Sequence, residues 1–191
     1  EKAWREPDEG IWEVRGGQHN FTYSRLMSWI AFDRALRIAL ARGFPCPMTE
    51  WRETRDRIFQ QVIERGYSQS RNAFVQVLDG DVLDASTLMM VMGHFVAPND
   101  PMMLSTIDAI REELVTDSLV YRYDPALAAS DGLDGEEGTF SICSFWWVEA
   151  LARAGVKPAA ILETRPDYRA ALHHLPRFLT APEYARKGLA M

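Results

Sequence analysis

The sequence is 191 residues long, enough for one domain with a sizeable core. Its formal net charge of −6 disfavours nucleic acid and anionic membrane surfaces as partners. No apolar stretch approaches the roughly 18 residues that a membrane helix requires, and the charged N-terminal residues lack the pattern of a signal peptide. The two cysteines, Cys46 and Cys143, lie too far apart to indicate a disulfide framework or a zinc site, so a reducing, cytoplasmic location is expected.

The first predicted helix covers residues 21–43. Apolar residues recur at helical spacing from Leu26 to Leu40, and further apolar residues, including Met27 and Ile38, fall on the other faces. A helix that is apolar on most sides is expected to be buried on most sides.

Four further predicted helices alternate in the amount of surface that they should bury. Residues 49–66 and 100–115 each carry a single apolar stripe, which is typical of a helix on the outside of a domain. Residues 84–95 and 139–155 are apolar nearly all round and should lie inside. The order inner, outer, inner, outer, inner predicts helical hairpins in a double-layered toroid, and a short extended piece is expected near Phe74.

The ends of these helices carry capping signals. Asp, Asn or Thr can accept a hydrogen bond from the first free N–H groups, and Gly tolerates the left-handed conformation that ends a helix. Pro101 suits a first helical position. The expected caps and stops are Asn20 or Thr22, Gly43, Thr49, Gly66, Asp84, Asp100 and Gly155.

The segment EGIWEVRGG, residues 9–17, places carboxyl groups beside an indole directly before the first helix. Its glycines permit a tight backbone that can come close to a substrate. Trp12 can stack on a sugar ring, and Arg15 can donate paired hydrogen bonds to sugar hydroxyls. Inverting glycosidases use one carboxylic acid and one carboxylate about 6.5–9.5 Å apart, and Glu13 fits the part of the acid.

The stretch GIWEVRGGQHNFTYSRLMSWIAFDRAL, residues 10–36, closely resembles the bacterial family-15 glycoside hydrolases, which include glucoamylase-like and trehalase-like enzymes. The motifs LDAS, VYRY and DGLDGEEGTFSICSFWWVEALARAG recur there in the same order, so that the resemblance covers about residues 7–155. It implies an all-α fold that is part of an (α/α)6 barrel, of which this chain would be a fragment holding mainly the second half. It also implies hydrolysis of α-glucosidic bonds in a disaccharide or oligosaccharide, chemistry that needs no metal or organic cofactor.

The resemblance also implies roles for individual residues. Glu13, which follows the IW pair, corresponds to the general acid, and Arg122 of VYRY corresponds to an arginine that contacts the sugar. Trp12, Arg15 and Glu137 are the other candidate substrate-binding residues. Each has a structural alternative, since a tryptophan can be core, an arginine can form surface ion pairs, and a glutamate before a helix can interact with the helix dipole.

Residues 156–191 depart from the family pattern. Several prolines break this tail into short pieces, and the expected closing helix is absent. Glu183 in TAPEY faintly echoes the motif of the general base, but Pro182 occupies its first acidic position. We therefore divide the chain into a partial glycosidase domain, residues 1–155, and a divergent tail, and the chain lacks a starting Met, as expected for part of a longer protein.

Two other interpretations are carried forward. The first is a non-catalytic helical scaffold, and the second is another helical-toroid carbohydrate enzyme, an epimerase or lyase, with His19 as the nearby acid/base. A half barrel alone is expected to have weak or no activity. It should also self-associate or partly unfold, because the inner helices would lack partners around Trp29, Met92 and Trp147.

Overall fold

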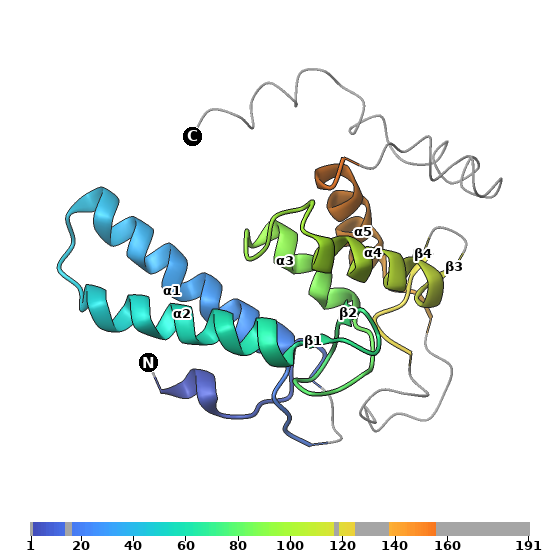
Figure 1. Ribbon diagram of the computed structural model, residues 1–191, viewed down its shortest axis with the longest axis horizontal. Coiled ribbons are helices and arrows are strands. Elements are labelled where there is room, and N and C mark those ends of the chain that lie inside the picture. The colour runs from blue at the N-terminus through green and yellow to red at the C-terminus, as the bar shows by residue number, and fades with distance from the viewer. Residues whose placement is uncertain (1, 14–16, 117–118, 125–137, 156–191) are drawn as a thin grey trace.

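The computed structural model describes residues 2–13, 17–116, 119–124 and 138–155. Two groups of helices lie side by side in it (Figure 1). The first group is a long antiparallel hairpin, formed by α1 (Thr22–Arg42) and α2 (Met48–Arg65). The second group gathers beside the end of the hairpin at which α1 begins and α2 ends. It consists of α3 (Met89–Met92), α4 (Pro101–Glu113) and α5 (Ser141–Arg153), with α5 in contact with the other two.

Short elements connect these helices. A 3₁₀ helix, η1 (Ala3–Arg5), precedes α1, and a second, η2 (Ala85–Leu88), leads into α3. Two small antiparallel hairpins pair Tyr67 with Phe74 and Val115 with Val120. Their strands are β1 (Tyr67–Ser68), β2 (Ala73–Phe74), β3 (Val115–Thr116) and β4 (Leu119–Val120).

The five predicted helical segments and the short extended piece near Phe74 are confirmed in chain order. The third segment differs in detail, because residues 84–95 form η2 followed by a single turn of α3 rather than one helix. The helix ends at Gly93, where a Cβ atom would lie 2.5 Å from Cδ1 of Ile30. His94 then turns the chain with a φ of 57°. The close approach of α1 to Gly93 therefore coincides with the end of this helix.

Two of the expected N-terminal caps are confirmed. Asp84 accepts a hydrogen bond from the Ser86 N–H at 2.7 Å, and Asp100 accepts one from the Met102 N–H at 2.9 Å. Pro101 occupies the first turn of α4, as expected.

The caps expected for α1 and α2 are wrong. The residues before these helices are Phe21 and Pro47, and neither makes a side-chain capping bond. At α1 a distant residue takes over the task, because the N–H of Thr22 donates to the carbonyl of Gln76 at 2.9 Å. The side chain of Asn20 instead accepts from Arg25.

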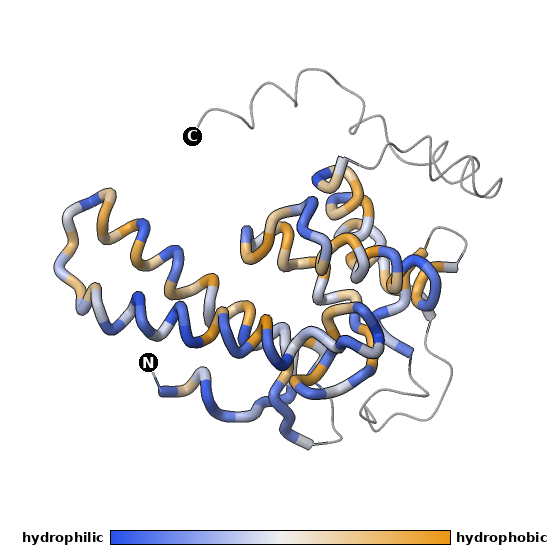
Figure 2. The backbone as a smooth tube through the Cα atoms, viewed as in Figure 1, coloured by the Kyte–Doolittle hydropathy of each residue, from blue (hydrophilic) through white to orange (hydrophobic). Residues whose placement is uncertain are grey.

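The core lies where the hairpin meets the second group of helices. Figure 2 shows α2 as largely hydrophilic and the second group as richer in hydrophobic residues. Ile58 and Val62 of α2 are fully buried while the charged faces of that helix remain outside, which confirms its single stripe. The core also includes Leu26, Phe74, Leu88, Met90, Met103, Ile110 and Trp147.

Burial of α1 on most of its sides is not found. Met27, Ile38 and Leu40 are 39%, 55% and 63% exposed, because the neighbouring described elements cover only part of the helix. The same holds for α5, where Ile142 and Phe145 are exposed although Cys143 and Trp147 are buried.

Trp29, Met92 and Trp147 were expected to lack packing partners, and none of the three is among the exposed apolar residues. Trp29 is only 7% exposed and packs against Phe95 with 5.0 Å between ring centres, and Trp147 is only 2% exposed. Met92 is partly buried. The exposed apolar side chains of α1 and α5 lie elsewhere on the helix surfaces. Within the described ranges, no helix is long and apolar enough to cross a membrane.

Candidate active site

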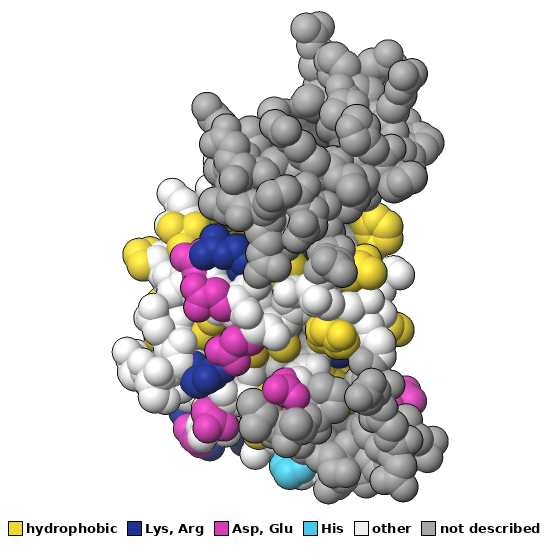
Figure 3. Space-filling model, turned by 90° about the vertical axis from the view of Figure 1, so that its right-hand side faces the viewer, with side chains coloured by type: hydrophobic (Ala, Val, Ile, Leu, Met, Phe, Trp, Pro, Cys, Tyr) yellow, Lys and Arg dark blue, Asp and Glu magenta, His cyan; other side chains and the backbone are white. Residues whose placement is uncertain are grey.

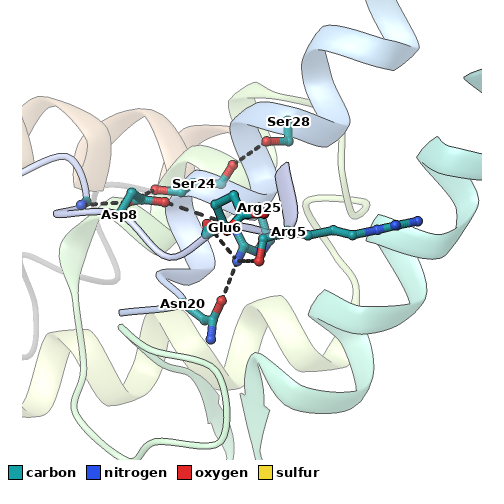
Figure 4. Close-up of polar contacts among 8 residues, drawn as sticks. Arg5, Glu6, Asp8, Asn20, Ser24, Arg25 and Ser28 are labelled. Carbon is teal, nitrogen blue, oxygen red and sulfur yellow. Dashed lines mark hydrogen bonds and ion pairs between the residues drawn. The ribbon is translucent and has the colours of Figure 1, made fainter. Parts of the chain in front are cut away.

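The segment that leads into the glycine-rich loop is held by Arg25 of α1 (Figure 4). The Arg25 side chain is 2% exposed, and its guanidinium donates to the carbonyl oxygens of Arg5 and Glu6 and to Oδ1 of Asn20. It also lies 4.0 Å from the Asp8 carboxylate. Burial lowers the pKa of Arg25, whereas the charge of Asp8 opposes this effect. The buried cation thus fixes the chain just before the loop.

Asp8 and His19 close the base of the loop. Their backbones exchange two hydrogen bonds, of 3.0 and 2.8 Å, and so form an isolated antiparallel bridge. The Asp8 carboxylate also accepts from the Gly10 N–H and from Oγ of Ser24. The imidazole of His19 packs edge-on against Phe21, at 5.9 Å between ring centres. These contacts give His19 a structural place in the loop.

Gly10 and Glu13 are the first and last residues of a turn in this loop. Gly10 has a φ of 70°, and a Cβ atom there would lie 2.9 Å from the Phe21 ring, so only glycine fits. The N–H of Glu13 donates to the Gly10 carbonyl at 3.3 Å. Glu13 itself has a φ of 51°, which is uncommon for a residue with a side chain. Its carboxyl group is exposed to solvent, as a group that donates a proton to a substrate requires.

Trp12 lies half-buried beside this exposed acid. Its Nε1–H donates to Oδ2 of Asp84 at 2.9 Å. Its ring contacts Phe140 edge-on at 5.8 Å and Trp146 at 6.1 Å. The indole is therefore held by one directional bond and by two aromatic neighbours, one just before α5 and one within it.

The structure brings Arg122 to the same place. Its guanidinium carbon lies 5.2 Å from the ring centre of Trp12, 5.3 Å from that of Tyr123 and 5.6 Å from that of Phe140. A cation against aromatic faces is a favourable arrangement, and the planar guanidinium is well suited to it. Two predicted substrate-binding residues, Trp12 and Arg122, are thus in direct contact.

Asp84 is a functional candidate that sequence reasoning missed, since it was interpreted only as a helix cap. It is 1% exposed and accepts from the Ser86 N–H, from Nε2 of Gln76 at 3.0 Å and from Trp12. Burial raises the pKa of Asp84, and the hydrogen bonds from Ser86, Gln76 and Trp12 oppose that change. The LDAS motif could have indicated Asp84, because this motif recurs in the family together with the loop that carries Glu13 (the acid loop).

Cys143 lies near this cluster but is not a nucleophile. Burial and, to a lesser extent, the charge of Asp84 raise its pKa to about 12, while Arg122 opposes the change. The thiol therefore stays protonated at neutral pH. Nucleophilic chemistry requires the thiolate, so Cys143 has a packing role at the start of α5.

Three sequence candidates, Arg15, Glu137 and Glu183, lie outside the described residues. Within the described part of the chain, no group of three or more metal-ligating acidic, His or Cys residues lies close enough to hold a metal ion. An open polar depression of about 470 Å³ lies at the end of α2, and neither Trp12, Glu13 nor Arg122 lines it. The candidate site is therefore the group of contacting residues Trp12, Arg122 and Asp84, together with Glu13, which follows Trp12 in the chain.

The described fold is mostly helical, and the loop before α1 carries the candidate acid, Glu13. The chain belongs to the Glycosyl hydrolases family 15, whose sequence profile matches residues 1–183. It is 46% identical over 154 residues to a trehalase of Mycobacterium tuberculosis, a match that covers 81% of this chain and 22% of the relative. A trehalase of Thermoplasma volcanium is 35% identical over 151 residues, covering 79% of this chain and 24% of that protein.

Solved glycosidases share the fold. A wild-type glycosidase matches with a TM-score of 0.69 at 22% identity, covering 83% of this chain and 40% of that one. A glycosidase in complex with glucose matches with the same TM-score at 21% identity. This likeness confirms that the chain is part of an (α/α)6 barrel. The chain spans about a quarter of the length of the trehalases that it matches.

Proposed function

We propose that this chain supplies the general-acid side of an inverting glycosidase that cleaves α-glucosidic bonds. The observation that carries the proposal is the placement of Glu13, an exposed carboxyl group on a loop whose base and whose neighbouring Trp12 are both anchored. A loop that merely connected two elements would not require this set of anchors. A fixed loop is what acid catalysis needs, because the proton must be delivered to one oxygen in one geometry.

Glu13 protonates the oxygen of the leaving group in this mechanism. A second carboxylate, about 6.5–9.5 Å away, activates the water that attacks from the opposite face of the sugar. Glu183 is our candidate for that base on the strength of its motif alone. No metal or organic cofactor takes part in these steps.

Trp12 and Arg122 form the wall beside the acid and hold the sugar. Arg122 is partly exposed, so its guanidinium can donate to sugar hydroxyls while its face rests on Trp12. Trp12 contacts Arg122, Phe140 and Trp146, and because it is only half-buried, its exposed surface can meet a sugar ring. Arg15 and Glu137 complete our proposed binding set.

Trehalose is the substrate that we favour over maltodextrin, because the relatives of known name are trehalases. Both described cysteines are free, which suits a reducing cytoplasmic compartment. Comparison of glucose release from trehalose, maltose and maltodextrin decides the substrate. Faster turnover of maltodextrin would reject the trehalose assignment without affecting the role of Glu13.

The test of the acid compares Glu13→Gln with Glu9→Gln, a matched change of an exposed acid on the same loop. The assays use the chain itself and a chimera in which residues 1–155 replace the matching segment of the Mycobacterium tuberculosis trehalase. Loss of a general acid costs about 10²–10⁴-fold in rate. We expect that loss for Glu13→Gln and a change of only a few-fold for Glu9→Gln. Equal activities of the two variants would favour the non-catalytic scaffold.

A further inference from the structure

We propose that Asp84 is the positioning residue of the acid loop: its buried carboxylate holds the indole of Trp12 and thereby fixes the direction of Glu13. This inference rests on the proposed function of Glu13 as the acid. Asp84 itself touches no substrate in this scheme, and it acts through Trp12.

The two oxygens of Asp84 have separate tasks. Oδ1 accepts the Ser86 N–H and caps η2, as any capping aspartate does. Oδ2 accepts from Nε2 of Gln76 and from Nε1 of Trp12. Among the described residues, the side chain of Asp100 caps α4 through a single bond from the Met102 N–H, so capping explains only one of the two tasks of Asp84.

The hydrogen bond from Nε1 of Trp12 to Asp84 is more directional than the ring contacts of this indole. The aromatic contacts with Phe140 and Trp146 favour burial of the ring but tolerate a range of tilts. A hydrogen bond weakens steeply away from linear geometry, so the bond to Asp84 sets the orientation of the ring. Glu13 is the next residue, and the reorientation of Trp12 would redirect it.

The same segment also positions the proposed sugar contact. The N–H of Ala85 donates to the carbonyl of Arg122 at 2.8 Å, and Asp84 forms an isolated antiparallel bridge with Tyr123. Asp84 therefore holds Trp12 of the loop that carries Glu13, and the adjacent Ala85 holds the backbone of Arg122. A single buried anchor can thus set the distance between the proton donor and the group that binds the sugar.

The variant Asp84→Asn separates the two tasks. Asparagine keeps one carbonyl oxygen for the Ser86 N–H, but its NH₂ group then faces two donors. The amide of Gln76 can turn to offer its oxygen, whereas the indole N–H of Trp12 can only donate. Asp100→Asn is the matched control, because it makes the same chemical change at a cap whose side chain has no second hydrogen bond within the described part of the chain. Trp12→Phe removes the indole donor and keeps an aromatic ring.

The first measurement is nuclear magnetic resonance on the full chain, with Trp12→Phe used to assign one of the six indole signals. We expect the Trp12 indole proton to exchange about tenfold or more faster in Asp84→Asn than in Asp100→Asn. The backbone order parameters of Trp12 and Glu13 should fall from about 0.85 towards 0.6 in Asp84→Asn only. An unchanged indole signal and unchanged order parameters would overturn the proposal, and this readout needs no enzymatic activity.

The second measurement is kinetic and uses the trehalase chimera. A misplacement on the order of 1 Å costs about 10²-fold, so Asp84→Asn should lower kcat by about 10–100-fold with little change in KM. Combination with Trp12→Phe should add little further loss, since both changes break one link. If the loop is loosened in Asp84→Asn but this variant is as active as the Asp100→Asn control, the positioning role is rejected. A failure of Glu13→Gln to lower activity would instead reject the proposed acid. The role of Asp84 in holding Trp12 would then still rest on the magnetic resonance measurement.

Discussion

The guanidinium carbon of Arg122 lies 5.2 Å from the ring centre of Trp12, which joins the loop before α1 to the segment after β4. The contact brings two residues that lie far apart in the sequence into one cluster with the rings of Phe140 and Tyr123. The guanidinium of Arg122 thus packs against rings from three parts of the chain: the loop before α1, the segment after β4 and the residue before α5.

Arg122→Lys should lower the free energy of unfolding of the chain by about 1–2 kcal/mol. A lysine keeps the charge, but it cannot lay a plane against several rings. Urea unfolding measures the change. The control is Arg5→Lys, since Arg5 lies 5.2 Å from a single ring, that of Trp4, and is exposed. An equal effect of the two substitutions would mean that the cluster around Arg122 is no stronger than an exposed pair.

Local rules predicted those parts of the fold that depend on neighbouring residues. Asp84 and Asp100 cap their helices as expected, because a capping side chain reaches only two residues along the chain. The cap of α1 failed because Gln76 supplies a carbonyl to Thr22, an interaction that no local pattern contains. The helix order could be predicted, whereas the substitute for a cap could not.

Burial and the candidate site show the same contrast between features set by neighbouring residues and features set by distant ones. An apolar face indicates that a helix has something to cover, but Ile38 and Leu40 are exposed because nothing among the described elements packs there. Glu13 and Trp12 were found from a contiguous motif. The bond from Trp12 to Asp84 spans 72 positions, so a single sequence gives no reason to pair them.

Gly10→Ala should destabilise the chain more than Gly43→Ala does. Both glycines have positive φ, 70° and 65°, so alanine is strained at either position. Around Gly43 nothing lies within 4 Å of a new Cβ, whereas at Gly10 the Phe21 ring lies at 2.9 Å. We expect a loss of about 1 kcal/mol for Gly43→Ala and about 2–4 kcal/mol for Gly10→Ala.

Thermal and urea unfolding of both variants would measure this difference. The excess at Gly10 reports the contact with Phe21 rather than the backbone strain, which the two sites share. Similar losses at the two positions would show that the loop relaxes away from Phe21. In the trehalase chimera such a relaxation should also move Glu13 and lower kcat.

Cys143 should resist alkylation in the folded chain at pH 8, whereas the partly exposed Cys46 should react with iodoacetamide. Burial first, and then Asp84, raise the pKa of the Cys143 thiol from 9.0 to about 12, so little thiolate is present. Mass spectrometry after labelling gives the modified residue directly. Labelling in urea, where both thiols are exposed, is the control, and rapid native labelling of Cys143 would contradict the prediction.

The same shift makes stability fall with rising pH. A group whose folded pKa is raised stabilises the fold fully below its unfolded pKa, and that contribution is lost as pH rises through the folded value. For Cys143 the window lies between about 9 and about 12. The stability difference between the wild-type chain and Cys143→Ala should therefore stay constant from pH 6 to 8 and shrink by pH 10. A constant difference up to pH 10 would show that the thiol is not protected.

The isolated chain should self-associate, and α5 should contribute to it. Ile142 and Phe145 are 45% and 61% exposed, and their spacing of three residues places them on one face of the helix. Phe140 before the helix adds a further exposed ring. Exposed apolar side chains on one helix face favour association. Figure 3 shows exposed hydrophobic side chains separated by polar and charged ones, so the association should be weak rather than obligatory.

Replacing both Ile142 and Phe145 with Gln should therefore shift the chain towards the monomer at concentrations where the wild type is mixed. Light scattering after gel filtration measures the mass across a dilution series. Phe44→Gln is the control, because Phe44 is 58% exposed but stands in the turn between α1 and α2, away from α5. Circular dichroism should confirm an unchanged helical fold in each variant. A wild-type chain that remains monomeric at every concentration would exclude self-association, and an equal shift by Phe44→Gln would remove α5 from its explanation.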